Sequence, residues 1–159
     1  MDNLTYRFST EEDKDIIERL LALKFGTRDG SLLNLNERYY LAFNELGELV
    51  AMTGISANTK FNGLEVDWTC VHDDYIRKGV ITDMIRVLIK DVKEDVYCSC
   101  WRWEGQPINL RHTMVTLGFM PVLVPRIAQS TQYSSCADIC THYNGGVCKC
   151  FEDLYVRRC

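Results

Sequence analysis

Apolar and polar residues alternate over several short runs of the chain, and each of these runs predicts a strand. Elsewhere apolar residues recur every three or four positions, which predicts amphipathic helices over residues 16–23 and 81–92. A third helix is expected from Pro107 to about Thr116, because proline suits the first turn of a helix. The predicted strands cover residues 4–8, 39–43, 49–55, 65–71, 96–101, 119–124 and 151–156.

The order of these elements predicts the fold class. Strand, helix, three strands, helix, strand, helix and strand follow one another before a polar tail begins, and no internal repeat or linker interrupts them. Such an order is typical of an α/β protein in which a central mixed sheet carries helices on both faces. We expect one domain over residues 1–127, with a Cys-rich C-terminal extension over residues 128–159 packed on it. A capping box is expected at Ser9 and Glu12, before the first helix.

Composition excludes several classes of protein. The 159 residues are 47% hydrophobic and carry a formal net charge of -4, which is typical of a globular protein and not of a nucleic-acid binder. No apolar run is long enough to span a membrane. The first residues are polar and acidic and do not resemble a secretory signal. We therefore expect a soluble, cytoplasmic protein that binds neither nucleic acid nor membrane.

The eight cysteines are unevenly placed, and five of them lie in the last 24 residues. Four thiols within fifteen residues are a candidate structural zinc site, because tetrahedral zinc prefers such soft ligands. The candidate ligands are Cys136, Cys140, Cys148 and Cys150. Three alternatives stay open: free half-buried thiols, disulfides, or redox-active thiols in which Cys98 and Cys100 join the tail.

A candidate anion site lies where the fourth predicted strand is followed by a basic connection and a helix. The first amides of a helix have no partners within the helix, and Gly79 precedes them. Arg77 and Lys78 add positive charge, and Thr82 adds a hydroxyl. The alternative is a glycine that only turns the chain beside two solvated basic residues.

The segment Val71-His-Asp-Asp-Tyr-Ile-Arg-Lys-Gly79-Val-Ile-Thr82 resembles the acyl-CoA signature of the GNAT superfamily of N-acyltransferases. Leu117-Gly-Phe119 resembles the end of that family's later helix, which begins near an asparagine, here Asn109. The order of elements is similar over about three-quarters of the chain. The chain departs from the family's phosphate motif at Ile76 and Ile81, where only the middle glycine of the motif is kept.

The resemblance implies acetyl-CoA as cosubstrate and assigns residues to it. Backbone amides near the glycine would hold the pyrophosphate, and the end of the fourth strand would align the pantetheine. The residues implied are Val71, Arg77, Lys78, Gly79, Val80, Ile81, Thr82 and Asn109.

Acetyl transfer to an amine requires removal of a proton from that amine. Glu65 and Asp67 lie on one face of the fourth predicted strand, because side chains two residues apart share a face. Relatives that use a carboxylate have it on this strand. The alternative for both residues is a solvated face or a salt bridge. Met114 stands where the family often has a tyrosine that protonates the thiolate.

The sequence therefore predicts an N-acetyltransferase in which an amine attacks acetyl-CoA directly in a ternary complex. A small molecule or a peptide would supply the amine, and its identity and the acyl chain length are left open. The alternatives are a non-catalytic acyl-CoA-binding domain and a metal-stabilised protein-interaction module. The oligomeric state is also left open, with a dimer among the alternatives.

Overall fold

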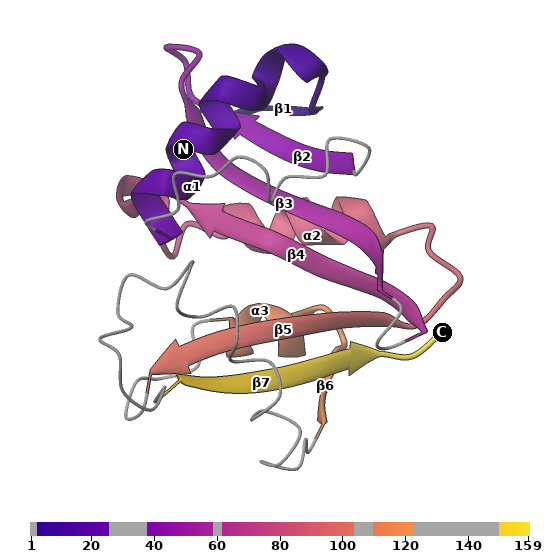
Figure 1. Cartoon of the computed structure of the whole chain (residues 1–159). Helices are drawn as coiled ribbons and strands as arrows, with labels where there is room; N and C mark the ends of the chain where they lie inside the picture. Colours follow the sequence, from indigo (N-terminus) through magenta and orange to yellow (C-terminus); the bar gives the residue numbers. More distant parts are fainter. Residues whose placement is uncertain (1–2, 26–37, 59–61, 104–109, 123–149) are drawn as a thin grey trace.

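A computed structural model describes residues 3–25, 38–58, 62–103, 110–122 and 150–159. Seven strands form one mixed sheet in the order β1-β2-β3-β4-β5-β7-β6 (Figure 1). The strands are β1 (Thr5–Phe8), β2 (Arg38–Phe43), β3 (Leu49–Asn58), β4 (Gly63–Val71), β5 (Val96–Trp103), β6 (Met120–Val122) and β7 (Cys150–Arg157). The helices are α1 (Lys14–Phe25), α2 (Val80–Ile89) and α3 (Arg111–Thr116). Two short 3-10 turns are η1 (Glu11–Asp13) and η3 (Asp73–Tyr75).

The sheet is antiparallel except at its centre. Strands β1 to β4 form an antiparallel run, β4 and β5 are parallel, and β7 is antiparallel to both β5 and β6. The final strand predicted over residues 151–156 is confirmed as β7. It lies between β5 and β6, so the end of the predicted extension belongs to the sheet itself. The division of the chain at residue 127 stays a prediction.

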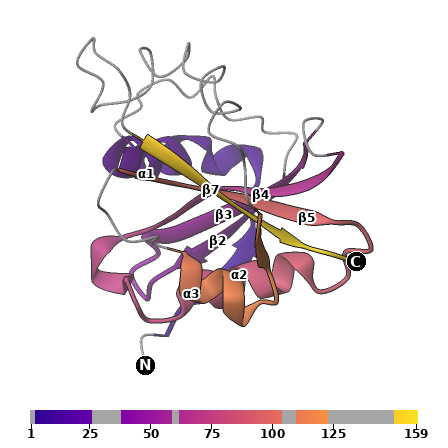
Figure 2. The ribbon, with the colours of Figure 1, turned by 90° about the horizontal axis from the view of Figure 1, so that it is seen from below.

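Helices cover both faces of the sheet, as the sequence predicted. Helix α1 lies on one face, and α2 and α3 lie on the other (Figure 2). Each face has its own apolar core. The α1 core contains Ile17, Leu20, Leu21, Tyr39, Leu41, Phe43, Met52 and Cys70. The other core joins α2 and α3 to the sheet, and it includes Met84, Ile85, Val66, Cys98, Met114 and Tyr155.

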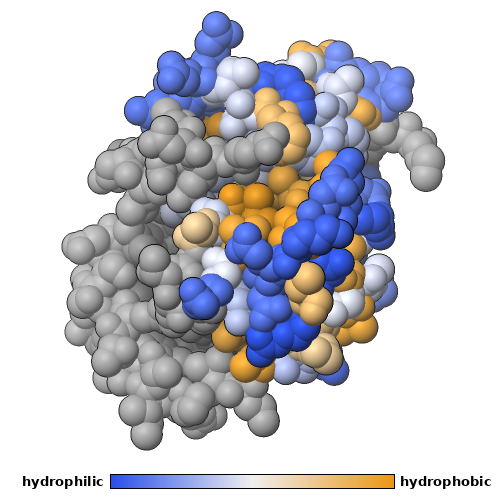
Figure 3. Space-filling view, turned by 90° about the vertical axis from the view of Figure 1, so that its right-hand side faces the viewer, coloured by the Kyte–Doolittle hydropathy of each residue, from blue (hydrophilic) through white to orange (hydrophobic). Residues whose placement is uncertain are grey.

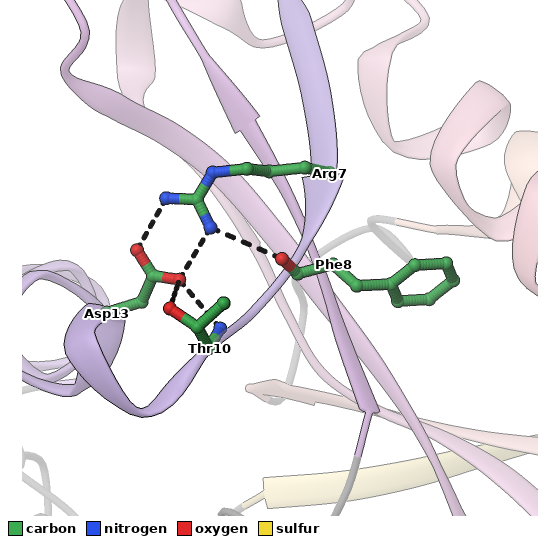
Figure 4. Close-up of polar contacts among 4 residues, drawn as sticks. All are labelled: Arg7, Phe8, Thr10 and Asp13. Atoms are coloured by element: carbon green, nitrogen blue, oxygen red, sulfur yellow. Dashed lines mark hydrogen bonds and ion pairs between the residues drawn. The ribbon is translucent and has the colours of Figure 1, made fainter.

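The start of α1 is fixed by an ion pair with β1. Arg7 donates two hydrogen bonds of 2.6 Å to the carboxylate of Asp13, which also accepts from the backbone amide and the hydroxyl of Thr10 (Figure 4). The pair holds the pKa of Asp13 at about 2. The capping box predicted at Ser9 and Glu12 is wrong by one residue, because the carboxylate that reaches back is that of Asp13.

Other predicted boundaries shift slightly. Helix α2 ends at Ile89, before Val92, and the described part of the third helix begins at Arg111. No helix among the described residues is long and apolar enough to cross a membrane. On the face shown in Figure 3, apolar side chains gather in a central patch beside a hydrophilic ridge.

Candidate functional site

The parallel strands β4 and β5 part halfway along their length. Residues 64–66 of β4 pair with residues 96–98 of β5, whereas β4 continues to residue 71 and β5 to residue 103. Figure 1 shows the two strands diverging from this point. We call residues 67–71 and 99–103 the fork. Beyond residue 98, β5 is paired with β7 and no longer with β4, so the facing edges of the fork do not form a ladder with each other.

A β-bulge lies in β4 at the fork. The register between β3 and β4 shifts between Met52 and Gly54, so that Thr53 opposes both Trp68 and Thr69. Trp68 has a φ of 42°, a left-handed conformation that is uncommon for a large side chain. The hydroxyls of Thr53 and Thr69 lie 2.8 Å apart and join the two strands beside the extra residue. Bulges of this kind redirect neighbouring side chains.

The bulge determines which side chains of β4 share a face. Val66 packs in the core under α2, so Glu65 and Asp67 on either side of it point to the α1 face. Trp68 and Cys70 also pack in the α1 core, although strict alternation from Asp67 would place Trp68 on the other face. The two candidate carboxylates are thus on one face, as expected from their spacing. Asp67 is the first residue of β4 beyond its last pair with β5.

Ser56 and Gly54 of β3 flank the Asp67 carboxylate, and Tyr39 lies beside Gly54. The Ser56 hydroxyl donates a hydrogen bond of 2.8 Å to Oδ2. Gly54, the cross-strand partner of Asp67, leaves room for Oδ1, because a Cβ atom at Gly54 would lie only 2.5 Å from that oxygen. The same Cβ would lie 2.9 Å from ring atoms of Tyr39, which is fully buried. The carboxylate therefore occupies space that only a glycine at this position provides.

The N-terminus of α2 begins at a glycine with open space in front of it. Gly79 precedes the helix with a φ of 82°, and no heavy atom of the described residues, its two chain neighbours aside, lies within 4 Å of where its Cβ would be. The first bond of the helix runs from the Asp83 amide to the Gly79 carbonyl, so the amides of Val80, Ile81 and Thr82 have no partner within the helix. This geometry suits an anion.

The side chains around this terminus divide into buried and exposed groups. Val80 and Ile81 are 5% and 8% exposed and pack in the core, so the bulk of Ile81 points away from the open space. Ile76 is 48% exposed. The Lys78 ammonium lies 4.8 Å from the centre of the Tyr75 ring, a cation–π contact that holds it beside the helix. Arg77 is exposed with a φ of 64°.

Helix α3 is joined to α2 by a polar contact and a buried side chain. The Thr82 and Thr113 hydroxyls lie 3.0 Å apart, so the hydroxyl proposed for anion binding already has a neighbour. Met114 is completely buried in the core beneath the two helices. The position at which the family often has a tyrosine is therefore part of the core in this chain.

Some predicted residues cannot be placed. Asn109, Cys136, Cys140 and Cys148 lie outside the described residues, and Cys150 is the first residue of β7. No group of three or more His, Cys, Asp or Glu side chains within the described residues could hold a metal ion. The predicted zinc site is thus unsupported by the described part of the chain.

The structure adds contacts that sequence reasoning missed. Lys24 of α1 reaches the loop before α2 and donates a hydrogen bond of 2.5 Å to Asp73, which lowers the pKa of that carboxyl group. Gly54 and Ser56 carry no signal in the sequence, because their role depends on the register between β3 and β4. The alternation of side chains along β3 places Ser56 on the α1 face. That alternation does not indicate that a carboxylate of β4 lies beside Ser56.

Comparison with known proteins identifies the fold. No family model matches the sequence, and no curated protein sequence matches it. Among solved structures, an aminoglycoside 6'-N-acetyltransferase complexed with coenzyme A has a TM-score of 0.68 and 14% identity, covering 96% of each chain. The aminoglycoside 6'-N-acetyltransferase from Enterococcus faecium has a TM-score of 0.69 and 13% identity, covering 97% of this chain and 96% of its own.

A third solved structure supports the same assignment. Arabidopsis thaliana NAA60 in complex with a bisubstrate analogue has a TM-score of 0.68 and 13% identity, covering 98% of each chain. These similarities extend over nearly the whole of both chains in each comparison. The chain therefore has the α/β fold of the GNAT acetyltransferases, which confirms the fold predicted from the sequence.

Proposed function

We propose that this chain is an acetyl-CoA-dependent N-acetyltransferase that acts on an amine of a small molecule or peptide. The observation that carries the proposal is the fork between β4 and β5 together with the open N-terminus of α2. The solved structures that share the fold include acetyltransferases, and one of these is complexed with coenzyme A. At 14% identity this likeness supports the activity only through the fold.

The α2 terminus fits the pyrophosphate of the cosubstrate. Gly79 leaves the approach open, and the amides of Val80, Ile81 and Thr82 provide donors whose helix dipole favours negative charge. Arg77 and Lys78 add two formal positive charges beside them. Because backbone amides supply these donors, the loss of the family's side chains at Ile76 and Ile81 leaves the set of amide donors intact.

The fork would take the extended pantetheine arm. An extended ligand can add to a free strand edge through main-chain hydrogen bonds, and the edges of β4 and β5 part where such a ligand would enter. Val71 at the end of β4 would align it, and Asn109 would contact it from the start of the later helix. When bound, acetyl-CoA supplies the activated thioester carbonyl.

Asp67 and Glu65 would assist deprotonation of the amine on the α1 face. A primary amine is mostly protonated at neutral pH, so an acceptor for its proton is required. Asp67 stands at the vertex of the fork and is oriented by Ser56. A water molecule would connect the carboxylate to the amine. The amine then attacks the carbonyl directly, and no acyl-enzyme is formed.

A second candidate function is acyl-CoA binding without catalysis. It is favoured by Met114, because a fully buried thioether replaces the tyrosine that often protonates the leaving thiolate in the family. A methionine has no proton to donate. In an active enzyme, water or another residue would have to supply that proton.

Titration calorimetry of acetyl-CoA tests the binding site. We expect micromolar binding to the wild-type chain and at least about fivefold weaker binding to Gly79→Asp, since an added charge near 4 Å from a phosphate costs about 1–4 kcal/mol. Gly47→Asp is the matched control, because Gly47 also has positive φ and open space but lies in the β2–β3 turn. Equal loss in both variants, or no binding to the wild-type chain, contradicts the site.

Release of CoA thiol over a panel of amines separates the two functions. An N-acetyltransferase gives turnover with at least one amine, and Asp67→Asn or Glu65→Gln lowers kcat more than acetyl-CoA affinity. Binding without turnover on the whole panel supports the non-catalytic function instead. Full activity in both variants would remove the two carboxylates from the mechanism.

A further inference from the structure

Cys98 and Cys100 form a pair of buried thiols that the proposed function does not use. They are 2% and 7% exposed, and their Sγ atoms lie 3.8 Å apart. Both are free cysteines. Two-residue spacing on β5 puts both side chains on one face of the strand, and both pack in the core beneath α2 and α3. The strand therefore holds two sulfurs in position to bind one atom together.

The distance between the two sulfurs indicates the coordination geometry of an atom that both could bind. With metal–thiolate bonds of about 2.3 Å, two sulfurs lie about 3.8 Å apart at a tetrahedral angle and about 4.6 Å apart in linear coordination. The observed 3.8 Å therefore matches a tetrahedral angle. A pyramidal centre with angles near 100° needs the two sulfurs about 3.5 Å apart, which is a small approach from the observed distance. Linear two-coordinate complexes would require the strand to spread.

The surroundings of the pair favour a ligand that needs two sulfurs and leaves no net charge. The pair lies among the apolar residues of the core, which include Met114 and Phe119. The hydrogen bond with Cys100 and burial both raise the pKa of the Cys98 thiol. Tetrahedral zinc needs four ligands, and the described residues contain no group of three or more His, Cys, Asp or Glu that could hold a metal.

We infer that the Cys98–Cys100 pair is a dithiol site for trivalent arsenic compounds with two exchangeable bonds to oxygen. In the reaction R–As=O + 2 Cys–SH → R–As(S–Cys)₂ + H₂O, two As–S bonds form while both S–H bonds and the As–O bonding are lost. Oxygen and both protons leave as water. Arsenic stays trivalent and the product is neutral, which suits the buried core. This inference does not depend on the proposed function.

The fork gives a reagent its route to the pair. Cys98 is the last residue of β5 that pairs with β4, and Cys100 lies in the fork, where β5 is held by β7 alone among the described strands. Strand ends with fewer partners open locally more readily than the centre of a sheet. Cys70 offers a matched control, since it is equally buried at 7% exposed but packs in the α1 core.

Differential thiol labelling after exposure to phenylarsine oxide tests the site. Reduced full-length protein is treated with the probe, and the remaining thiols are blocked with iodoacetamide under denaturing conditions. Excess dimercaptopropanol then removes the arsenical, and the released thiols are labelled with N-ethylmaleimide. Trypsin cuts after Lys93 and Arg102, so residues 94–102 form one peptide whose only cysteines are Cys98 and Cys100.

We expect both cysteines of this peptide to carry N-ethylmaleimide, and Cys70 to carry iodoacetamide. Cys98→Ser and Cys100→Ser should each lose the label from the remaining thiol, whereas Cys70→Ser should leave the doubly labelled peptide unchanged. Absence of that label in the wild-type protein overturns the inference, and this measurement needs no variant to fold. Labelling of the remaining thiol in either single variant also overturns it, because a chelate requires both sulfurs.

Discussion

Gly54→Ala is the sharpest test of how β3 positions the candidate base. The new methyl group would lie 2.5 Å from Oδ1 of Asp67 and 2.9 Å from the ring of Tyr39. Because the Tyr39 ring is fully buried, its 2.9 Å contact has to be relieved by a shift of the ring or of β3. The 2.5 Å contact is relieved by a displacement of the Asp67 carboxylate. Its displacement strains the hydrogen bond that Ser56 donates to Oδ2. Overpacking of this kind costs about 1–3 kcal/mol of stability.

Gly54→Ala should change kcat more than it changes the affinity for acetyl-CoA. A displacement of roughly 1 Å at a reacting group lowers the rate by on the order of 100-fold, so kcat in the thiol-release assay should fall strongly. Acetyl-CoA affinity should stay within about twofold, because neither Gly54 nor Asp67 is among the residues assigned to the cosubstrate, and a loss confined to the reacting groups lowers kcat. Ser56→Ala removes the hydrogen bond without adding atoms, and it should lower kcat by a smaller factor.

A double-mutant cycle shows whether the effect passes through Asp67. In the Asp67→Asn background, Gly54→Ala should change kcat much less than in the wild-type background, because coupled residues are not additive. Gly47→Ala controls for lost stability, since a left-handed residue in an open turn costs roughly 1–2 kcal/mol without touching the site. Equal losses of kcat in both Asp67 backgrounds would refute the positioning argument.

Two further predictions concern stability and the α2–α3 contact. Asp13→Asn should destabilise the fold by roughly 1–2 kcal/mol near pH 7, since the 48% exposed Arg7 side chain limits the gain. Because pairing lowers the folded-state pKa of Asp13 to about 2, its contribution is lost as pH falls from about 4 to 2. In denaturant melts the loss of stability over this range should therefore be smaller for Asp13→Asn than for the wild-type chain, although the lowered pKa values of Asp73 and Asp95 keep part of it in both proteins. Thr82→Val should lower the free energy of unfolding by about 1 kcal/mol in the same assay, because it removes the hydroxyl contact with Thr113. Unchanged melts would contradict this prediction.

Periodicity predicted the inner strands well because they pack at least one face in a core, whereas β1 and β6 at the two edges of the sheet are mostly exposed. Periodicity was less informative where a local irregularity changes the face of the sheet to which the next side chains point. The alternation over residues 65–71 does not show that Trp68 is the extra residue of a bulge, although the bulge puts Asp67 and Trp68 on one face. The place of β7 between β5 and β6 is equally absent from the pattern, because strand order depends on pairing between distant segments.

The sequence predicted the parts of the candidate site that the backbone forms. A glycine before a helix indicates free amides whatever the adjacent side chains are, and the structure shows that space at Gly79. Contacts between side chains could not be read in this way. Asp67 of β4 contacts Ser56 of β3 because Asp67 is paired with Gly54, two residues before Ser56. That pairing depends on a register between β3 and β4 that shifts by one residue.

The bulge and the fork together explain why one carboxylate of β4 is a better candidate than the other. Glu65 lies where β4 is still paired with β5 through Tyr97. Asp67 is the first residue past the last pair, and the bulge begins directly after it. A ligand that enters where the strands part would therefore meet Asp67 first. If one carboxylate acts on the amine, Asp67→Asn should lower kcat more than Glu65→Gln does.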